Sequence, residues 1–380
     1  MKKGWEEIFF FNFIKLNRGF DLPNNKIEAG NYPVIASTSI KAYHKNFKVI
    51  APCVTTGRSG SLGVVQYVNQ DSWPLNTTLY VKDFKKNDPK FVYYFLQTMD
   101  FDTFNSGAGV PTLNQNHLHH IKIQIPKDIN HQKRIASILS AYDDLIEVNN
   151  KRIELLEQSA RELYKEWFVR MRFPNYQNTK FNKGIPEGWK EKNCYHIVNI
   201  LGGGTPSTNN PTYWNGNILF YTPSDYTPTF FSFNTEKKLT EKGLMNSSTK
   251  LFPKHTTFVT ARGTIGNLIM AGYPMAMNQS CFGLIAKEKE ELFFIFLYAE
   301  QMVNYLKLVA SGATFDAITL KTFENYKSKI PNKELRILFN QKVSPIFTQI
   351  ETLQKQNQEL TAIRDRLLPR LISGKLEVKA

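Results

Sequence analysis

The sequence is poor in several features that define large protein classes. Its 380 residues include three cysteines, Cys53, Cys194 and Cys281, which are odd in number and far apart. This pattern argues against a disulfide framework and predicts a reducing, cytoplasmic setting. No uninterrupted apolar run reaches the roughly 18 residues of a membrane helix. The opening MKKGWEEIFFFNFIKL lacks a small-residue cleavage site and is interrupted by Glu6 and Glu7, so we do not expect a signal peptide or membrane contact.

Motifs of catalysis are incomplete. The glycine turn LGGGTP, residues 201–206, lacks the Lys-Ser/Thr that completes a nucleotide-binding P-loop. Residues 210–213, Asn-Pro-Thr-Tyr, approach the Asn-Pro-Pro-Tyr of amino-methyltransferases, but Thr212 replaces the second proline and no glycine motif of a methyl-donor site accompanies them. We therefore expect neither a nucleotide nor a methyl donor to bind this chain.

Two further patterns are weak. One pattern loosely matches the residue spacing of a metal-dependent nuclease and consists of Pro223, Asp225, Glu236 and Lys238. Its Glu-Lys-Lys at 236–238 is more simply interpreted as a solvated turn. The other is a histidine cluster formed by His117, His119 and His120. It lacks a carboxylate or cysteine partner at the spacing of metal ligands, so it predicts a polar loop. The sequence thus predicts no catalytic residue and no metal site.

Positive charge is what the sequence has in excess. Lys and Arg number 48 against 33 Asp and Glu, a formal charge of +15. Nucleic acid is the commonest anionic partner of such a protein, although a lysine-rich, merely solvated surface gives the same composition.

An internal repeat organises the chain. Val54-Thr55 recurs as Val259-Thr260, Gly107 as Gly312, and Ile125-Pro126 as Ile330-Pro331, each 205 residues later. The segments SGAGVPTLNQNHL, from Ser106, and SGATFDAITLKTF, from Ser311, belong to this repeat. We expect each to form a loop, a short capped helix and a last strand that leads into a long helix.

Each repeated domain is followed by a long helical sequence. No proline or glycine interrupts the residues from Ile129 to Phe168, and Asp128 is a good N-cap. Apolar residues recur at alternating steps of four and three, the heptad pattern of paired helices. The first seam is Tyr142, Ile146, Asn149, Ile153, Leu156, Ala160, Leu163 and Trp167, and the second is Ile346, Ile350, Leu353, Asn357, Leu360, Arg364, Leu367 and Leu371.

These seams predict that the two helices pair with each other in antiparallel orientation. We expect Asn149 and Asn357, one in each seam, to lie at different heights along the pair, where buried asparagine can set register. Pro345 fits the first turn of a helix, so the second helix is expected to begin or kink there.

The globular halves predict α+β domains with mixed or antiparallel sheets. Expected strands are YPVIAS, FKVIAP, GVVQYV, TLYVKD and IKIQIP in the first half, and NILFYT, TTFVTA, NLIMAG, CFGLIA and KSKIP in the second. Expected helices span residues 89–99 and 290–310, with short turns after Asn114 and Thr319.

Each half also has a turn that joins glycine to arginine. These are Thr56-Gly57-Arg58-Ser59-Gly60 and Ala261-Arg262-Gly263-Thr264-Ile265-Gly266. Glycine lets a backbone approach a ligand closely, and arginine can form bidentate hydrogen bonds with a phosphate or with the edge of a guanine base. One such turn is a plain hairpin, whereas two in a basic protein favour DNA contact.

With the repeat, helices and turns together, the sequence resembles the specificity subunit of type I restriction-modification enzymes over essentially its whole length. In the second half, TPSTNNPTYWNGNILFYTPSDYT looks like the opening of that family's recognition domain, with Phe220 where the family usually has tryptophan. ARGTIG, the first helix HQKRIASILSAYDDLIEVNNKRIELLEQSARELYKEWF and the ending LLPRLISGKLEV are also characteristic. The first half departs: it has GNYPVIAST at this opening and Gly57-Arg58-Ser59-Gly60 at its turn, so Arg58 and Arg262 need not be equivalent.

The resemblance implies two target recognition domains, residues 1–127 and 187–332, separated by long helices at 128–170 and 333–380 with a linker at 171–186. It implies a non-catalytic subunit that reads a bipartite, asymmetric sequence in double-stranded DNA. Two methyltransferase subunits using S-adenosylmethionine would dock on the helices, and a motor-nuclease restriction subunit would use ATP and Mg. These cofactors belong to the partners, and none is expected on this chain.

The residues expected to contact DNA lie in the turns and domain openings: Lys41, Lys45, Arg58, Ser59, Thr205, Thr222, Asp225, Arg262, Thr264 and Gln279. Two other functions stay open at this point. One is an autonomous DNA-modifying enzyme with degenerate methyltransferase or nuclease motifs. The other is a coiled-coil adaptor with two protein-binding domains.

Overall fold

The computed structural model describes residues 2, 4–107, 109–310 and 317–378. The chain forms two compact units. Unit 1 comprises Met1–Glu147 and Gln358–Ala380, and unit 2 comprises Val148–Asn357. Each long helix therefore contributes residues to both units. None of the helices among the described residues is both long and apolar enough to span a membrane.

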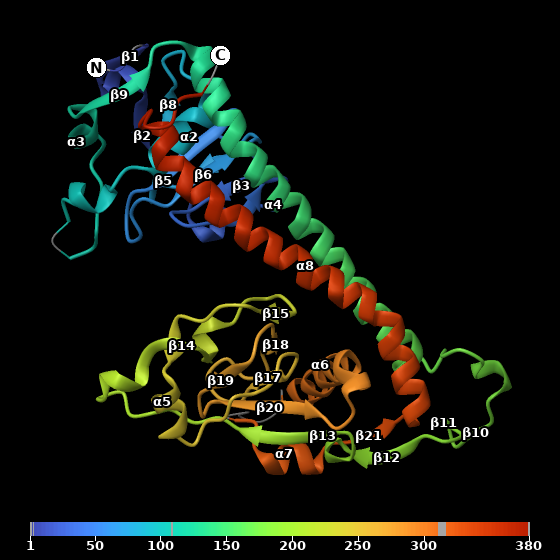
Figure 1. Ribbon diagram of the computed structural model, residues 1–380. Coiled ribbons are helices and arrows are strands. Elements are labelled where there is room, and N and C mark those ends of the chain that lie inside the picture. The colour runs from blue at the N-terminus through green and yellow to red at the C-terminus, as the bar shows by residue number, and fades with distance from the viewer. Residues whose placement is uncertain (1, 3, 108, 311–316, 379–380) are drawn as a thin grey trace. The chain divides into compact units, whose positions relative to one another are not determined.

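Unit 1 contains a four-stranded antiparallel sheet, order β2-β8-β5-β6, a three-stranded mixed sheet, order β4-β3-β7, and the antiparallel pair β1-β9 (Figure 1). The strands are β1 Trp5–Phe9, β2 Lys15–Arg18, β3 Tyr32–Ile35, β4 Ile40–His44, β5 Cys53–Gly57, β6 Val65–Val68, β7 Trp73–Pro74, β8 Thr78–Asp83 and β9 Lys122–Pro126. The helices are α1 Phe10–Phe13, α2 Pro89–Gln97 and α3 Gln115–His119, with 3-10 turns at Asn24–Lys26 and Phe101–Phe104.

Unit 2 repeats this plan. Its sheets have the orders β13-β20-β17-β18-β15, β16-β14-β19 and β12-β21, with a small hairpin β10-β11. The strands are β10 Phe181–Asn182, β11 Ile185–Pro186, β12 Lys190–Asn193, β13 Val198–Gly202, β14 Trp214–Tyr221, β15 Phe231–Ser232, β16 Lys237–Leu239, β17 Thr257–Thr260, β18 Leu268–Ala271, β19 Met275–Met277, β20 Cys281–Ala286 and β21 Lys327–Ile330. The helices are α5 Glu241–Met245, α6 Leu292–Ala310 and α7 Leu320–Asn325, with 3-10 turns at Tyr176–Asn178, Cys194–His196, Pro211–Tyr213, Pro223–Asp225 and Lys289–Glu291.

The predicted internal repeat is confirmed at the level of topology. The order β2-β8-β5-β6 of unit 1 matches β13-β20-β17-β18 of unit 2, and β4-β3-β7 matches β16-β14-β19, including one antiparallel and one parallel pair in each. The α+β class with mixed or antiparallel sheets is likewise confirmed. Similar backbone geometry thus arises from two halves whose side chains differ at most positions.

One predicted strand is wrong. FKVIAP, residues 47–52, is not a strand: only Val49 forms an isolated bridge, to Ser72, and the regular strand β5 begins at Cys53. The apolar run was misleading because Ile50 is exposed, so the residues do not line a buried sheet face. Nine other predicted strands correspond to β3, β6, β8, β9, β14, β17, β18, β20 and β21.

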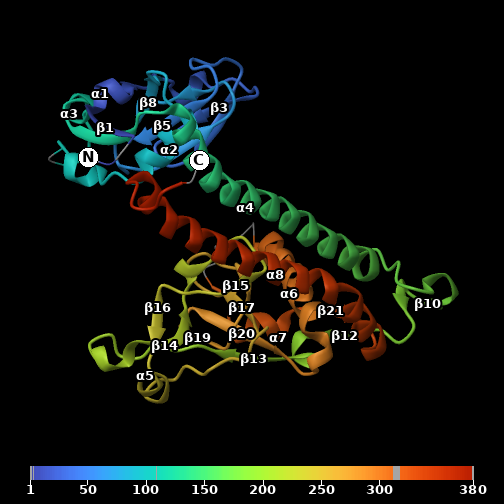
Figure 2. The ribbon, with the colours of Figure 1, turned by 45° about the horizontal axis from the view of Figure 1, so that its top comes forward.

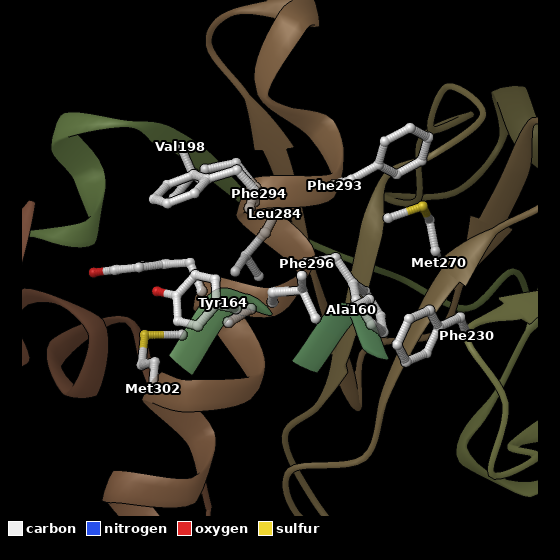
Figure 3. Packing of buried hydrophobic residues seen from close by; sticks show 14 of the residues in the cluster. Ala160, Tyr164, Val198, Phe230, Met270, Leu284, Phe293, Phe294, Phe296 and Met302 are labelled. Atoms are coloured by element: carbon white, nitrogen blue, oxygen red, sulfur yellow. The ribbon is translucent and has the colours of Figure 1, made fainter. Parts of the chain in front are cut away.

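Each unit has its own apolar core. In unit 1 the core joins the sheet and α2 to the first turns of α4 and the last turns of α8, through Leu139, Leu368 and Leu371 among others. In unit 2 aromatic rings dominate, and Figure 3 shows Ala160 of α4 beside Phe296 of α6. Each long helix is therefore held by burial of its apolar face against a globular domain, the dominant favourable term in folding.

The helices α4 Ile129–Tyr164 and α8 Lys333–Ile372 lie side by side in both views (Figure 1, Figure 2). The predicted span of the first helix is confirmed, because α4 is followed directly by a π-helical turn at Lys165–Val169. Asp128 caps the start, with its Oδ1 accepting from the N–H of Asn130 at 3.0 Å.

The prediction about Pro345 is wrong for the start of α8, which begins twelve residues earlier, at Lys333. Proline removes one N–H from the helix interior. Here Pro345 is exposed, so solvent can reach the turn that lacks this bond. The first turns of α8 are also held by two sets of hydrogen bonds. Arg336 donates to both carboxylate oxygens of buried Glu291 at 2.9 and 3.1 Å. Asn340 Oδ1 accepts from the N–H groups of Phe293 and Phe294 at the start of α6.

The antiparallel pairing of the helices is confirmed, but the expected offset of the two asparagines is wrong. In unit 2, Asn149 Nδ2 donates to Asn357 Oδ1 at 2.9 Å, so the two side chains lie at the same level. Trp167 meets Phe339 with ring centroids 5.3 Å apart. Counting positions along each seam misled the prediction, because the third position of the first seam faces the fourth position of the second.

The predicted linker, residues 171–186, forms the 3-10 turn at Tyr176–Asn178 and the hairpin β10-β11. Phe173 is buried, and its ring lies 5.6 Å from that of Trp189. This segment is therefore a packed part of unit 2.

Candidate nucleic-acid interface

The first hairpin loop, residues 58–64 between β5 and β6, rests on the turn that precedes β8. The N–H groups of Arg58 and Ser59 both donate to the carbonyl of Thr77, at 2.8 and 3.2 Å. The Arg58 guanidinium reaches the carbonyl of Asn76 at 3.4 Å. Ser37 Oγ bonds to the carbonyls of Ser59 and Thr77, at 3.0 Å each. Arg58 is half-buried, so part of its hydrogen-bonding capacity is used inside the protein.

The repeated segment that begins at Ser106 fastens this loop from its other side. Gly60 N–H donates to the carbonyl of Pro111 at 3.0 Å, and Leu113 N–H donates to that of Arg58 at 2.8 Å. In unit 2 the corresponding bond runs from the N–H of Ile318 to the carbonyl of Ala261 at 3.0 Å. Residues 311–316 of the second copy, including Gly312, lie outside the described residues. The segment recurs because each hairpin loop needs this clamp before the chain turns into α3 or α7.

The second hairpin loop, residues 261–267 between β17 and β18, has a fixed base and an exposed tip. Gly266 has φ +78°, and a Cβ there would come within 2.5 Å of Val303 on α6, so the close packing needs glycine. Gly263 has the same positive φ but faces open space. Arg262 and Thr264 are exposed at this tip. Both Gly-Arg turns are hairpin loops, as predicted, but Arg262 is the more available side chain.

A hub turn, Met277–Ser280, joins three other segments of unit 2. The carbonyl of Met277 accepts from the N–H of Gly204 at 3.1 Å, and the carbonyl of Ser280 accepts from the N–H of Ala261 at 2.7 Å. The N–H of Asn278 donates to the carbonyl of Tyr221 at 3.0 Å. Consequently the predicted residues Thr205, Thr222, Arg262, Thr264 and Gln279 belong to segments joined at one turn. Thr205 Oγ1 also bonds directly to Gln279 Oε1.

Unit 1 has the same hub at Leu75–Thr77. Leu75 N–H donates to Ile35, Asn76 N–H to Phe20, and Thr77 accepts from the hairpin loop. The sequence prediction missed the hub residues Asn76 and Asn278. The segments WPLNTTLYVK and YPMAMNQSCFGLIAK already align as repeats, and this alignment pointed to the hub. The two asparagines are not equivalent, however, because by strand pairing and backbone bonds Leu75 matches Asn278 and Asn76 matches Gln279.

Asp225 has an internal role in the structure. Its Oδ2 accepts from the N–H and Oγ1 of Thr222, at 2.8 and 2.7 Å, and its Oδ1 accepts from the N–H of Glu236 at 2.7 Å. Both carboxylate oxygens are engaged within the loop, so the geometry supports a residue that positions Thr222. Among the described residues there is no group of three or more His, Cys, Asp or Glu that could hold a metal ion. His117, His119 and His120 lie on or directly after α3, not in a loop.

Of the lysines predicted to contact DNA, Lys41 lies on β4 of the other sheet of unit 1 and Lys45 directly follows that strand. Lys41, on β4, donates to Asn24 Oδ1 at 2.7 Å, and Lys45 pairs with Glu28 at 2.5 Å. The hydrogen bond from Lys45 lowers the pKa of Glu28. Both lysines are exposed, and such surface ion pairs contribute little to stability. They remain available to a phosphate backbone but belong to a different element from Arg58 and Ser59.

The residues predicted for the helix-pairing seam all lie on covered faces. None is exposed among Tyr142, Ile146, Asn149, Ile153, Leu156, Leu163, Trp167, Ile346, Ile350, Leu353, Asn357, Leu360, Leu367 and Leu371. In unit 2, Asn149 also donates to Gln356, and Asn357 donates to Asn150. The buried amide of Asn149 is thus hydrogen-bonded, as buried polar groups usually are.

Single carboxylates fasten the helices to the globular domains. In unit 1, Asp143 accepts from the Tyr94 hydroxyl at 2.5 Å and pairs with Arg364. Burial, together with the bond to Asp143, raises the pKa of Tyr94. In unit 2, burial opposes ionisation of Glu351, but hydrogen bonds from Lys254, Lys355 and His255 lower its pKa to about 2.

A third carboxylate, Glu157 of α4, is buried against the loop before β15. Its Oε1 accepts from the N–H of Phe230 at 3.0 Å, and its Oε2 lies 3.4 Å from Arg161, which also donates to Glu300 at 2.8 Å. Burial raises the pKa of Glu157 to about 7, although Arg161 opposes this rise. Part of the contact between α4 and the domain therefore depends on a carboxyl that titrates near neutral pH.

A duplicated α+β domain, each copy presenting a hairpin loop on a hub turn and each attached to a pair of helices, defines a tandem recognition protein. Comparison with known proteins names the family. The model of the type I restriction modification DNA specificity domain matches residues 2–158 and 186–362, and the chain belongs to that family.

Several relatives are similar along most of their length. The chain is 24% identical over 438 residues to the type I restriction enzyme HindI specificity subunit of Haemophilus influenzae, covering 96% of this chain and 94% of the relative. It is 26% identical to the MjaIX specificity subunit of Methanocaldococcus jannaschii, over 76% of this chain and 69% of the relative. The crystal structure of a type I restriction-modification S subunit from M. genitalium has the same fold, with a TM-score of 0.64, 17% identity and coverage of 99% and 97%.

Proposed function

We propose that this chain is the sequence-specific DNA-binding subunit of a type I restriction-modification complex and gives that complex a bipartite, asymmetric target. The observation that carries the proposal is the duplicated hairpin loop, clamped in each unit by a repeat segment and a hub turn. The formal charge of +15 favours a polyanionic partner. Family membership favours this function over an autonomous enzyme or a coiled-coil adaptor.

The two domains would read different half-targets because their loops offer different chemistry. In the first, Arg58 is half-buried and bonded to a backbone carbonyl. In the second, Arg262 stands exposed beside a glycine with open space around it. Phosphate contacts position a protein on DNA, whereas contacts to base edges specify the sequence. We assign Arg262 and Thr264 to the second half-target, and Arg58 and Ser59 to the first.

The partners follow from the same proposal. Two methyltransferase subunits would dock on this chain along its paired helices, and motor-nuclease restriction subunits would complete the assembly. S-adenosylmethionine, ATP and Mg would be bound by those partners, and this chain would be non-catalytic and located in the cytoplasm with chromosomal DNA. Incomplete methyl-donor and P-loop motifs support this division.

The test is to map methylated adenines in DNA from cells that contain this subunit and its methyltransferase partner. We expect a motif of two defined halves separated by a fixed unspecified spacer. Replacing only the hairpin loop of unit 2 should change one half and leave the other intact. A continuous motif, or no dependence on this chain, would contradict the proposal.

Two measurements on the purified chain address the alternatives. A steep fall of duplex affinity with salt indicates phosphate contacts and is not expected of a protein adaptor. Binding of S-adenosylmethionine by the isolated chain would support the autonomous enzyme, particularly if substitution of Tyr213 abolished it.

A further inference from the structure

A groove in unit 1 is lined by residues that belong neither to the hairpin loop nor to the hub turn. It has a volume of about 420 Å³ and is lined by residues at the end of β1, in α1, and in and directly after α3. Helix α1 contacts both β1 and α3. Its lining residues are Phe9, Phe11, Asn12, Asn116, His119 and His120. None of them is used in the DNA-binding proposal.

Two phenylalanines are exposed at this groove. Phe9 and Phe11 are 48% and 40% exposed, whereas Phe10 and Phe13 of the same segment are fully buried. His119 packs edge-on against Phe11, with ring centroids 5.2 Å apart. Two neighbouring exposed aromatic rings beside a concave surface form the kind of apolar patch that marks an interaction site.

The repeat provides an internal control for this patch. Unit 2 has the same strand pair, short helical turn and capped helix, but at the matching positions it carries Asn193 and Tyr195 instead of Phe9 and Phe11. On α7, Glu324 stands where α3 has His119. Because the same fold forms with Asn193 and Glu324 at the places of Phe9 and His119, folding does not require the Phe9 ring or the histidine, and only the ring at the position of Phe11 is kept, as Tyr195.

Positive charge surrounds the rings. The ammonium groups of Lys15 and Lys85 lie 5.9 and 5.5 Å from the centre of the Phe11 ring, and that of Lys122 lies 6.0 Å from that of Phe9. Glu7 and Asp83 pair with Lys122 and Lys85 at 3.3 and 2.9 Å, respectively. These five charged groups sum to a small positive excess, which complements a modestly acidic ligand.

The polar groups of the groove suit a peptide backbone. His119 Nε2 accepts from the N–H of Leu16 at 3.2 Å, which leaves Nδ1 of the neutral ring as a donor. Burial, with His120 and Lys15 nearby, lowers the pKa of His119 and favours this neutral form. The amides of Asn12 and Asn116 add donors and acceptors at the rim.

We propose that this groove docks a segment of a partner protein in which an aromatic or leucine side chain is flanked by aspartate or glutamate. The apolar side chain contacts Phe9 and Phe11, and the acidic residues meet Lys15, Lys85 and Lys122. A nucleic acid fits less well, because single-stranded binding grooves combine stacking rings with a strongly positive track, whereas carboxylates here offset two of the lysines. The inference does not depend on DNA binding by the hairpin loops.

The experiment measures fluorescence polarisation of a labelled peptide, Ser-Asp-Glu-Phe-Asp-Leu-Glu-Asp-Ser, titrated with the full-length chain. We expect a Kd between about 10 µM and 1 mM, since the contact area is small. Replacing Phe and Leu of the peptide with serine, or its acidic residues with lysine, should each weaken binding at least about fivefold.

Protein variants localise the site. Phe9→Ser combined with Phe11→Ser should weaken peptide binding at least about fivefold, while Tyr195→Ser at the matching place in unit 2 should not. Both changes replace rings that are at least partly exposed, and circular dichroism and duplex DNA binding check that each variant is folded.

Three outcomes would overturn the proposal. These are no binding up to about 1 mM peptide, equal binding by the double variant, and equal binding of the lysine-substituted peptide. An oligothymidine of about ten nucleotides serves as the competing ligand. If it binds more tightly than the peptide and loses affinity with the double variant, the groove is a nucleic-acid site instead.

Discussion

The paired helices predict how the spacer of the DNA target can be lengthened. From Asn149 to Trp167 the chain advances 18 residues along α4 and the π-helical turn that follows it. The partner helix α8 retreats 18 residues, from Asn357 to Phe339. By the same register Leu156 lies opposite Ile350. One heptad inserted after Leu156 and one before Ile350 would therefore keep the seam continuous and the two asparagines paired.

The size of the effect follows from helix geometry. Seven residues at 1.5 Å per residue add about 10 Å to each helix. That length corresponds to about three base pairs at 3.4 Å per step along one strand. If the helix pair sets the separation at which the two half-targets are read, both halves should stay unchanged while the spacer grows by up to about three base pairs.

The assay is methylation mapping with the lengthened subunit and its methyltransferase partner. A control that inserts four residues at the same two points turns each distal segment by about 40°, because four residues exceed one turn of 3.6, and should impair the complex without defining a new spacer. An active complex that keeps the original spacer after the heptad insertion would refute the idea that the helices act as a ruler.

The remaining predictions concern single side chains. Arg262→Ala should weaken binding of the second half-target by about 1–3 kcal/mol and relax specificity at one base position, whereas Arg58→Ala should affect only the first half, as measured by binding to duplexes with each half altered. Arg336→Met leaves buried Glu291 without its partner and should destabilise unit 2 by about 3–5 kcal/mol, measured by hydrogen exchange of α6, while adding Glu291→Leu should recover most of the loss. The pKa of Glu157 is raised from its ordinary 4.5 to about 7, so protonation favours the fold and its contribution is complete below about pH 4.5 and lost as pH rises through 7. Glu157→Gln should match the native protein near pH 4.5 and exceed its stability by up to about 3 kcal/mol at pH 8 in denaturant titrations, and unchanged pH dependence would contradict this account.

Sequence reasoning found the features that repeat or keep a strict period. The long helix from Ile129 was predictable because an apolar residue every three or four positions, without proline or glycine, has few alternative structures. The short strands β7 and β15, of two residues each, carry no such pattern and were missed. Their pairing depends on the neighbouring strands that tertiary structure brings to them.

The candidate site was predictable in its loops but not in the roles of its side chains. The Gly-Arg turns were visible in the sequence, and their different residues indicated that Arg58 and Arg262 need not be equivalent. The sequence did not show, however, that Arg262 is exposed while the Arg58 guanidinium faces the carbonyl of Asn76. Asp225 is a further example: a carboxylate in a loop suggests ligand contact, whereas two hydrogen bonds from Thr222 and one from Glu236, beyond β15, use both oxygens. Such roles depend on backbone positions, which a residue type alone does not determine.

The duplication shows that each recognition loop is held by backbone hydrogen bonds, whereas the side chains at its tip are a separate feature. Leu113 and Ile318 clamp their loops through backbone N–H groups, and the two hub turns act mainly through backbone groups as well. Because these bonds need no particular side chain, the tip residues are free to differ between the copies without loss of the clamp. Glycine is the exception at position 266, where a side chain would collide with Val303. A chain built in this way can keep one architecture while its two halves diverge toward different DNA sequences, and exchanging only the residues at a loop tip is therefore the change that should alter specificity at least cost to stability.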